Sequence, residues 1–191
     1  MPRVRPFVAA ALLVSSSALV SAAPASSSNC AGAEAEAQAL NPVQLESIVT
    51  CLINEERAKA DLRSVRFSAR LRRAALGHSQ DMVRRGYFEH TSPSGETFVD
   101  RITATGYTRG ARRWLLGENL IWVRGTESTP QAMVDDWMSS SAHRANLLRA
   151  RFREIGVAAV RGTPISGGDQ GGVTVSSEYG FRKRIRPLRR R

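Results

Sequence analysis

The chain has 191 residues, enough for one domain with a hydrophobic core, and its 28 Lys and Arg against 17 Asp and Glu give a formal net charge of +11. Most of this charge lies at the two ends, because Arg3 and Arg5 begin the chain and residues 182–191 are mostly basic and contain no acid. No aromatic residues are interleaved with these arginines, so we expect no nucleic-acid partner.

The N-terminus has the organisation of an export signal. Two arginines precede an apolar run over residues 7–20, and small residues follow at 21–25. The run is interrupted by three serines and is shorter than the roughly 20 apolar residues of a membrane span. We therefore predict a signal peptide over 1–25 and a protein that is secreted, either extracellular or in the cell envelope. The candidate cleavage sites are after Ala22, Ala23 and Ala25.

The next segment, 26–43, is rich in alanine, serine and glutamate and is interpreted as a leader to a domain over 44–181. The leader contains Cys30, and Cys51 is the other cysteine of the chain. An exported chain with two cysteines favours a disulfide, and only one intramolecular pairing exists. This bond would close a loop of about 20 residues, for which chain entropy predicts roughly 3 kcal/mol of stabilisation.

Three helices are expected in the first half of the domain. Asn41-Pro42 is a helix start signal, and apolar residues then recur at three- and four-residue steps. A second helix is predicted over Ala69–Arg85, where Gly86 would end it. A short third helix is predicted over Phe98–Thr105, before Gly106.

The second half of the domain contains the strand signals. Leu120–Val123 predicts a short buried strand, and Thr129-Pro130 begins a fourth helix. Ile155–Val160 and Gly172–Tyr179 predict an antiparallel pair of strands. The order of helices and strands indicates an α+β sandwich, and we expect a monomer. The fourth helix is predicted to face the core with the side chains of Ala132, Met133 and Trp137.

Three polar residues, far apart in sequence, are suited to one site: His90, Glu118 and His143. Each is predicted to lie in a polar turn between apolar segments. Two imidazoles and a carboxylate can bind a divalent metal, exchange protons or brace a polar cleft. His78, by contrast, lies on the apolar face of the second helix and is interpreted as a core histidine with a hydrogen-bond partner. Among the tryptophans, Trp114 is expected to be exposed and the others are expected to pack in the core.

Six motifs follow one another along the chain. They are Asn54–Arg57, His78–Met82, Phe88–Pro93, Gly117–Asn119, Trp137–Leu148 and Glu154–Ala158. In this order they resemble the bacterial branch of the CAP superfamily, which contains cysteine-rich secretory proteins, antigen 5 allergens and pathogenesis-related proteins. The match covers roughly residues 45–180. The resemblance implies a three-layer α-β-α sandwich with a small antiparallel sheet and a central cleft.

The resemblance also implies the residues of that cleft. His90, Glu118 and His143 match the two histidines and the Gly-Glu-Asn glutamate of the family. A second family glutamate often follows the matched tryptophan, where this chain has serines; Asp135 or Asp136 could supply that carboxylate instead. Some family members hold a divalent cation between the histidines, so His90, His143 and Glu118 are candidate ligands for zinc or another divalent ion. A hydrogen-bonded network that braces the loops is the alternative.

Two functions remain open at this stage. The first is a binding module for a small apolar or cell-envelope-derived ligand, with or without a metal. The second is a hydrolase of peptide or peptidoglycan that uses His90, Glu118 and His143 with an activated water. No Gly-x-Ser-x-Gly elbow is present, and Ser140 or Ser141 is better explained as a helix cap.

The C-terminal segment Arg182–Arg191 is predicted to be a basic tail. Such a tail could adhere to an anionic cell-surface polymer or to an anionic membrane surface, where each basic residue contributes about 1 kcal/mol. The alternative is a tail that only aids solubility.

Overall fold

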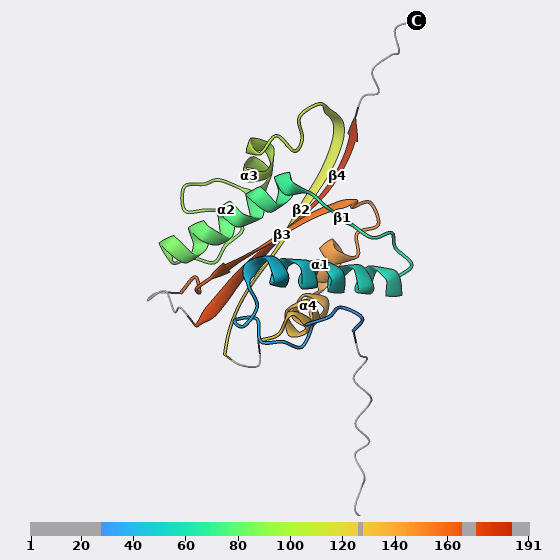
Figure 1. The fold of residues 1–191 in the computed structure, drawn as a ribbon. Helices are drawn as coiled ribbons and strands as arrows, with labels where there is room; N and C mark the ends of the chain where they lie inside the picture. Colours follow the sequence, from blue (N-terminus) through green and yellow to red (C-terminus); the bar gives the residue numbers. More distant parts are fainter. Residues whose placement is uncertain (1–27, 126–127, 166–170, 185–191) are drawn as a thin grey trace, which may run out of the picture.

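A four-stranded sheet in the order β1-β3-β4-β2 forms the middle layer of the fold (Figure 1). In the computed structural model, which describes residues 28–125, 128–165 and 171–184, β1 runs parallel to β3 and the other neighbours are antiparallel. The strands are β1 Arg66–Phe67, β2 Ala111–Arg124, β3 Glu154–Arg161 and β4 Gly172–Arg184. Helices cover both faces of this sheet, which confirms the predicted three-layer α+β sandwich.

β2 is longer than the strand predicted at Leu120–Val123. It begins at Ala111 and has 14 residues, so the predicted extent is wrong. Its first half exposes Arg112 and Trp114 and therefore lacks the apolar alternation that indicates a strand. Pairing with β4 along its length supplies the hydrogen bonds that the local sequence does not predict. Glu118, predicted in a turn, consequently lies within a strand.

The helices of the described residues are α1 Pro42–Lys59, α2 Ala69–Arg85, α3 Phe98–Ala104, α4 Pro130–Ser139 and α5 Ser141–Leu147. α1 begins with a capping box in which Asn41 and Gln44 bond each other's backbone amides. α2 ends at Gly86, whose φ of 68° is a left-handed conformation that favours glycine. Both ends agree with the sequence signals.

The two faces of the sheet carry different helices. α1, α4 and α5 pack on one face, where the larger core cluster includes Val49 of α1, Trp137 of α4 and Leu147 of α5. α2 and α3 pack on the other face, around Leu71 and Ile102. Because side chains of a strand alternate between the two faces of a sheet, consecutive residues along β2, and likewise along β4, point into different layers.

The inner face of α4 differs in detail from the prediction. Trp137 is buried, as expected, and its Nε1 donates a hydrogen bond to the Leu120 carbonyl at 3.0 Å. Ala132 is exposed, so its predicted inward position is wrong, whereas Met133 is buried as predicted and Val134 is buried as well. Trp122, for which core packing was also predicted, is only half-buried.

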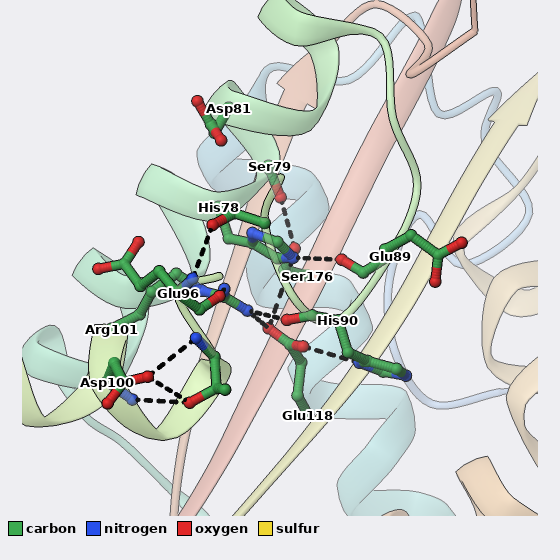
Figure 2. A network of polar contacts seen from close by, with 12 residues as sticks. His78, Ser79, Asp81, Glu89, His90, Glu96, Asp100, Arg101, Glu118 and Ser176 are labelled. Carbon is green, nitrogen blue, oxygen red and sulfur yellow. Dashed lines mark hydrogen bonds and ion pairs between the residues drawn. The ribbon is translucent and has the colours of Figure 1, made fainter. Parts of the chain in front are cut away.

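α2 lies unusually close to β3. A Cβ atom on Gly156 would be 1.9 Å from the backbone nitrogen of Arg72, so no other residue fits there without moving the helix. A buried hydrogen bond of 2.7 Å between the hydroxyls of Ser79 and Ser176 joins α2 to β4. This close contact places His78 of α2 directly over the sheet (Figure 2).

The segment predicted as a leader packs against the domain. Cys30, Ala33 and Ala37 are buried in the larger core cluster. Cys30 and Cys51 form the predicted disulfide, with Cα atoms 5.9 Å apart. The described part of the leader is therefore fastened to the middle of α1 and contributes to the core.

The C-terminal strand extends into the segment predicted as a tail. β4 ends at Arg184, and Arg182 forms an ion pair with Glu154 at 3.0 Å and lies over the ring of Tyr107. The predicted signal peptide at 1–25 and residues 185–191 lie outside the described residues. Of the helices in the described segments, none has the length and apolar character needed to cross a bilayer.

Candidate functional site

Glu118 is the centre of a buried polar network on β2 (Figure 2). Its side chain is 0% exposed; Oε1 lies 2.7 Å from His90 Nδ1, and Oε2 accepts a hydrogen bond of 2.8 Å from Arg101. Burial raises the pKa of this carboxyl group, but the hydrogen bonds with His90 and Glu178 and the charge of Arg101 outweigh that effect, and the pKa is lowered. Glu118 is therefore a buried, ionised carboxylate.

Arg101 holds the loop of His90 against this carboxylate. Its Nη1 donates to the Glu96 carbonyl at 3.0 Å and its Nη2 to the His90 carbonyl at 2.9 Å. One buried cation thus neutralises Glu118 and joins both ends of the segment 90–96. Sequence analysis missed Arg101. The available signal was its position next to the apolar Ile102 in the helix predicted over Phe98–Thr105.

The side chain of His90 is 53% exposed, so its ring reaches solvent while Nδ1 contacts Glu118. An ionised carboxylate can only accept, so Nδ1 carries the proton that bonds to Glu118, and in the neutral ring Nε2 keeps its lone pair. This hydrogen bond raises the pKa of His90. Nε2 makes no hydrogen bond to any described residue and is available for a proton, a ligand or a metal.

His78 lies behind Glu118 and confirms the prediction of a core histidine. It is 1% exposed, and its Nε2 donates to the Glu89 carbonyl at 2.9 Å. Its Nε2 also lies 3.9 Å from a Glu118 oxygen. Burial lowers the pKa of His78, so the ring is neutral near pH 7 and this contact is not an ion pair.

Glu178 belongs to the same network and was missed by sequence analysis. The register of β2 and β4 places it opposite Glu118. It is 0% exposed, and its carboxyl oxygens have no donor among the other described residues, so the hydrogen bond that it shares with Glu118 requires a proton on one of the two carboxyl groups. Burial, followed by the negative charge of Glu118, raises the pKa of Glu178 well above its ordinary value. An acidic residue within the predicted strand Gly172–Tyr179 was the signal that could have identified it.

α5 brings His143 to the same region. Asn119 Nδ2 donates to the His143 carbonyl at 3.1 Å, and Asn146 Nδ2 donates to the Glu118 carbonyl at 3.0 Å, so α5 is fastened to β2 beside the network. Burial lowers the pKa of the half-buried His143, and repulsion from His90 lowers it further. The three predicted residues therefore approach one region from a loop, a strand and a helix.

The donor set fits a metal only in part. Both oxygens of Glu118 already accept hydrogen bonds from side chains, so in this arrangement Glu118 orients His90 and is not itself a ligand. His90 Nε2 and His143 remain as donors. Across the described segments, one group of three has ligand atoms within 4.8 Å of one another. It consists of Cys30, Cys51 and Glu55, and its two sulfurs are joined in the disulfide.

The serines beside the histidines have structural partners. Ser92 is buried, and its hydroxyl contacts Ser94 at 2.9 Å and accepts from the Glu96 amide at 3.2 Å, which shapes a turn. Ser139 donates to a backbone carbonyl. Ser140 precedes α5, but its side chain makes no capping bond, so the cap predicted there is not formed. In the described parts of the chain, no serine hydroxyl hydrogen bonds to either imidazole of the pair.

A hollow of about 260 Å³ opens beside His143, and we call it the Trp122 hollow. Its apolar wall consists of Phe88, Leu120, Ile121, Trp122 and Trp137. Asp136 also lines it, whereas Asp135 accepts a hydrogen bond from Gln131 elsewhere on α4. Of the two carboxylates considered for the family's second glutamate, Asp136 is therefore the one beside His143.

A larger groove of about 480 Å³ lies at the β1 edge of the sheet, where α1 meets β1 and β3. We call it the Phe67 groove. Val43 and Phe67, 66% and 64% exposed, form its apolar rim. Glu46 and Arg72 form an ion pair of 2.6 Å within it. Trp114, 46% exposed as predicted, lines neither this groove nor the Trp122 hollow.

Comparison with known sequences gives a consistent family. The model of the cysteine-rich secretory protein family (CAP) matches residues 51–177. The uncharacterized protein YkwD of Bacillus subtilis (strain 168) is 35% identical over 115 residues, which is 60% of this chain and 42% of YkwD. The uncharacterized membrane protein YlbC of the same organism is 30% identical over 118 residues, 61% of this chain and 32% of YlbC. The match thus spans less than half of either relative.

Solved structures show the same fold. An outer surface protein from Borrelia burgdorferi aligns with a TM-score of 0.62 at 19% identity, over 75% of this chain and 97% of that chain. An extracellular protein containing an SCP domain from Bacillus anthracis aligns with a TM-score of 0.55 at 26% identity, over 75% of this chain and 44% of that chain.

Proposed function

The chain belongs to the cysteine-rich secretory protein family, and from this premise we propose that it is an exported binding module for a small apolar or cell-envelope-derived ligand. The observation that carries the proposal is the Trp122 hollow, an open and mostly apolar surface that the half-buried His143 also lines. Pockets for small ligands combine such apolar walls with a few polar groups that fix orientation.

The lining suggests how a ligand would lie. Trp122 and Phe88 offer aromatic surface for its apolar part. His143 and Asp136 offer a donor and an acceptor for a polar group. The buried Glu118 stays outside the contact surface and acts by holding His90 in one orientation.

Export is supported by independent features. The N-terminal residues have the pattern of a signal peptide, and the disulfide is a bond that persists in oxidising compartments. The aligned protein from Bacillus anthracis is described as extracellular.

The proposal is tested with a neutral fluorescent probe, N-phenyl-1-naphthylamine. Trp122→Ala should weaken probe binding at least tenfold, because it removes the main apolar wall of the hollow. Phe67→Ala is the matched control, since it removes an exposed aromatic ring from the Phe67 groove instead. Absence of binding by the parent, or equal loss in both variants, would contradict the proposal.

A hydrolase is the second candidate, favoured by the 2.7 Å contact that fixes the protonated Nδ1 of His90 against Glu118. In this orientation Nε2 could take a proton from water. Peptide or peptidoglycan turnover by the parent, lost in His90→Ala and in His143→Ala, would support it. A parent without turnover removes it.

A divalent metal would be held by His90 Nε2 and His143, with remaining ligands from solvent or substrate, and would supply a Lewis acid. Elemental analysis after dialysis against zinc tests this. Near-stoichiometric zinc that His90→Ala abolishes is the expected result if the metal is part of the site. Equal zinc in the parent and the variant would place the metal elsewhere.

We also propose that the basic C-terminal segment adheres to an anionic surface. Because Arg182 belongs to β4 and is paired with Glu154, the appropriate deletion is 185–191. Binding to phosphatidylglycerol vesicles should fall after this deletion and at high salt. Binding that is indifferent to both changes would reject it.

A further inference from the structure

A pocket with many charged side chains in its lining lies between α2 and α3. Its volume is about 360 Å³, and it shares no lining residue with the Trp122 hollow. α2 supplies Arg73, Gly77 and His78 to its wall, and Arg101 lines it from α3. We call it the Arg73 pocket.

The charges around this pocket are mostly positive. Four arginines line it against two acids. The arginines are Arg73, Arg84, Arg85 and Arg101, and the acids are Asp81 and Glu96. Arg84 and Arg85 both form ion pairs with Asp81. Arg101 forms its ion pair with the buried Glu118. The protein therefore leaves an excess of positive charge at the pocket.

Two of the cationic groups are incompletely satisfied by the protein. Arg73 is exposed and has no ion pair or side-chain hydrogen bond with any described residue. Arg101 is 7% exposed, and its Nε is buried without a hydrogen-bond partner among the described residues. Guanidinium groups that surround a concave site, with donors to spare, match the geometry and charge of phosphate oxygens.

One acid of the pocket is also available. The side chain of Glu96 makes no hydrogen bond or ion pair in the described structure, although its backbone carbonyl binds Arg101. A free carboxylate next to a phosphate would repel it, but it can accept a hydrogen bond from a hydroxyl group. The pocket thus combines donors for a phosphate with an acceptor for a neighbouring hydroxyl.

We propose that the Arg73 pocket binds the phosphate group of a small hydroxylated molecule, with the phosphate between Arg73 and Arg101 and a hydroxyl at Glu96. This site is separate from the Trp122 hollow and does not depend on the function proposed for it. Because Arg73, Arg84 and Arg85 are exposed, binding is weak and falls with salt.

The test uses amide chemical shifts of the purified protein during titration with inorganic phosphate and with glycerol 3-phosphate. Gly77→Leu fills the pocket, because a Cβ at this position meets nothing within 4 Å and the residue lies in a helix. It should abolish binding of both probes. Arg73→Ala should weaken both at least fivefold, while Arg70→Ala, an exposed arginine of α2 that does not line the pocket, should have no effect.

Glu96→Ala separates the two probes. It should reduce the affinity for glycerol 3-phosphate relative to inorganic phosphate, because only the former carries hydroxyl groups on a carbon chain. Phosphatidylglycerol vesicles distinguish the source of the phosphate: binding that Gly77→Leu weakens indicates a lipid headgroup, and binding insensitive to it indicates a soluble compound. Shifts reproduced by sodium chloride at equal ionic strength, or unchanged phosphate affinity in Gly77→Leu, would overturn the proposal.

Discussion

Glu118 and Glu178 lie opposite each other on β2 and β4, both buried, yet only Glu118 has a cation bound to it. Two adjacent carboxylates in a site of low dielectric cannot both ionise at ordinary cost. Arg101 and His90 hold the pKa of Glu118 low, and burial with the charge of Glu118 raises that of Glu178. One carboxyl group of the pair therefore carries a charge and the other carries a proton.

This asymmetry predicts the pH dependence of Glu178→Gln. The folded state holds the proton of Glu178 more tightly than the unfolded state, so stability falls as pH rises from about 4.3 toward the folded pKa, by up to about 1.4 kcal/mol per pH unit. Glutamine is neutral and removes this dependence. Chemical denaturation at pH 5 and pH 8 should show the variant gaining on the parent as pH rises. An identical pH dependence in both proteins would contradict a protonated Glu178.

Glu118→Gln, by contrast, should destabilise the folded protein. It leaves the buried guanidinium of Arg101 without its counter-ion, so about 3 kcal/mol or more of the free energy of unfolding should be lost at pH 7. Glu89→Gln is a suitable control, because this glutamate lies next to His90 in the loop and its side chain is exposed. Denaturation midpoints measure both changes, and equal stability of the two variants would show that Arg101 does not depend on Glu118.

The three histidines should titrate in a defined order. Hydrogen bonding to Glu118 raises the pKa of His90, whereas burial lowers those of His78 and His143. NMR titration of the ring protons should place His90 above about 6.5 and the others below it. The stabilisation from protonated His90 is present below its unfolded pKa and disappears as pH rises through the folded value.

The same experiment tests the cause of the shift. In Glu118→Gln the pKa of His90 should fall, because the carboxylate that stabilises the imidazolium is gone. A His90 pKa that does not respond would mean that the hydrogen bond is absent in solution.

Two glycines should respond to alanine with opposite signs. Gly156→Ala forces a Cβ into the backbone of α2, and it should cost more than about 2 kcal/mol. Gly77→Ala adds a Cβ to open space on the same helix, and it should stabilise by about 0.5–1 kcal/mol. Thermal unfolding measures both, and a neutral Gly156→Ala would show that α2 can move away from β3.

Removing the disulfide tests the attachment of the leader. The double variant Cys30→Ser, Cys51→Ser should lose about 3 kcal/mol of stability through the entropy of the unfolded chain. The parent under reducing conditions should match it. If the double variant kept the stability of the oxidised parent, the leader would be held by packing alone.

The resemblance found from sequence motifs identified His90, Glu118 and His143 as one region, and the structure brings them there from three elements. It did not identify Arg101 or Glu178. The network depends on which residues of two paired strands face the same layer, and this follows from the β2–β4 register. Neither strand indicates that register by itself, because the first half of β2 is largely exposed and shows no alternation of apolar and polar residues.

The features that the sequence determined by itself are those that depend on residues of a single segment or on a single possible pairing. The predicted bounds of α2 match the structure because the periodic apolar residues and the terminal Gly86 are features of one segment. The disulfide followed from the presence of only two cysteines. Only the tertiary structure decided which carboxylate is charged, which nitrogen of His90 is free and which glycine touches a helix. Those properties arise from atoms that are distant in sequence and share one buried space, where burial and neighbouring charges fix the protonation state.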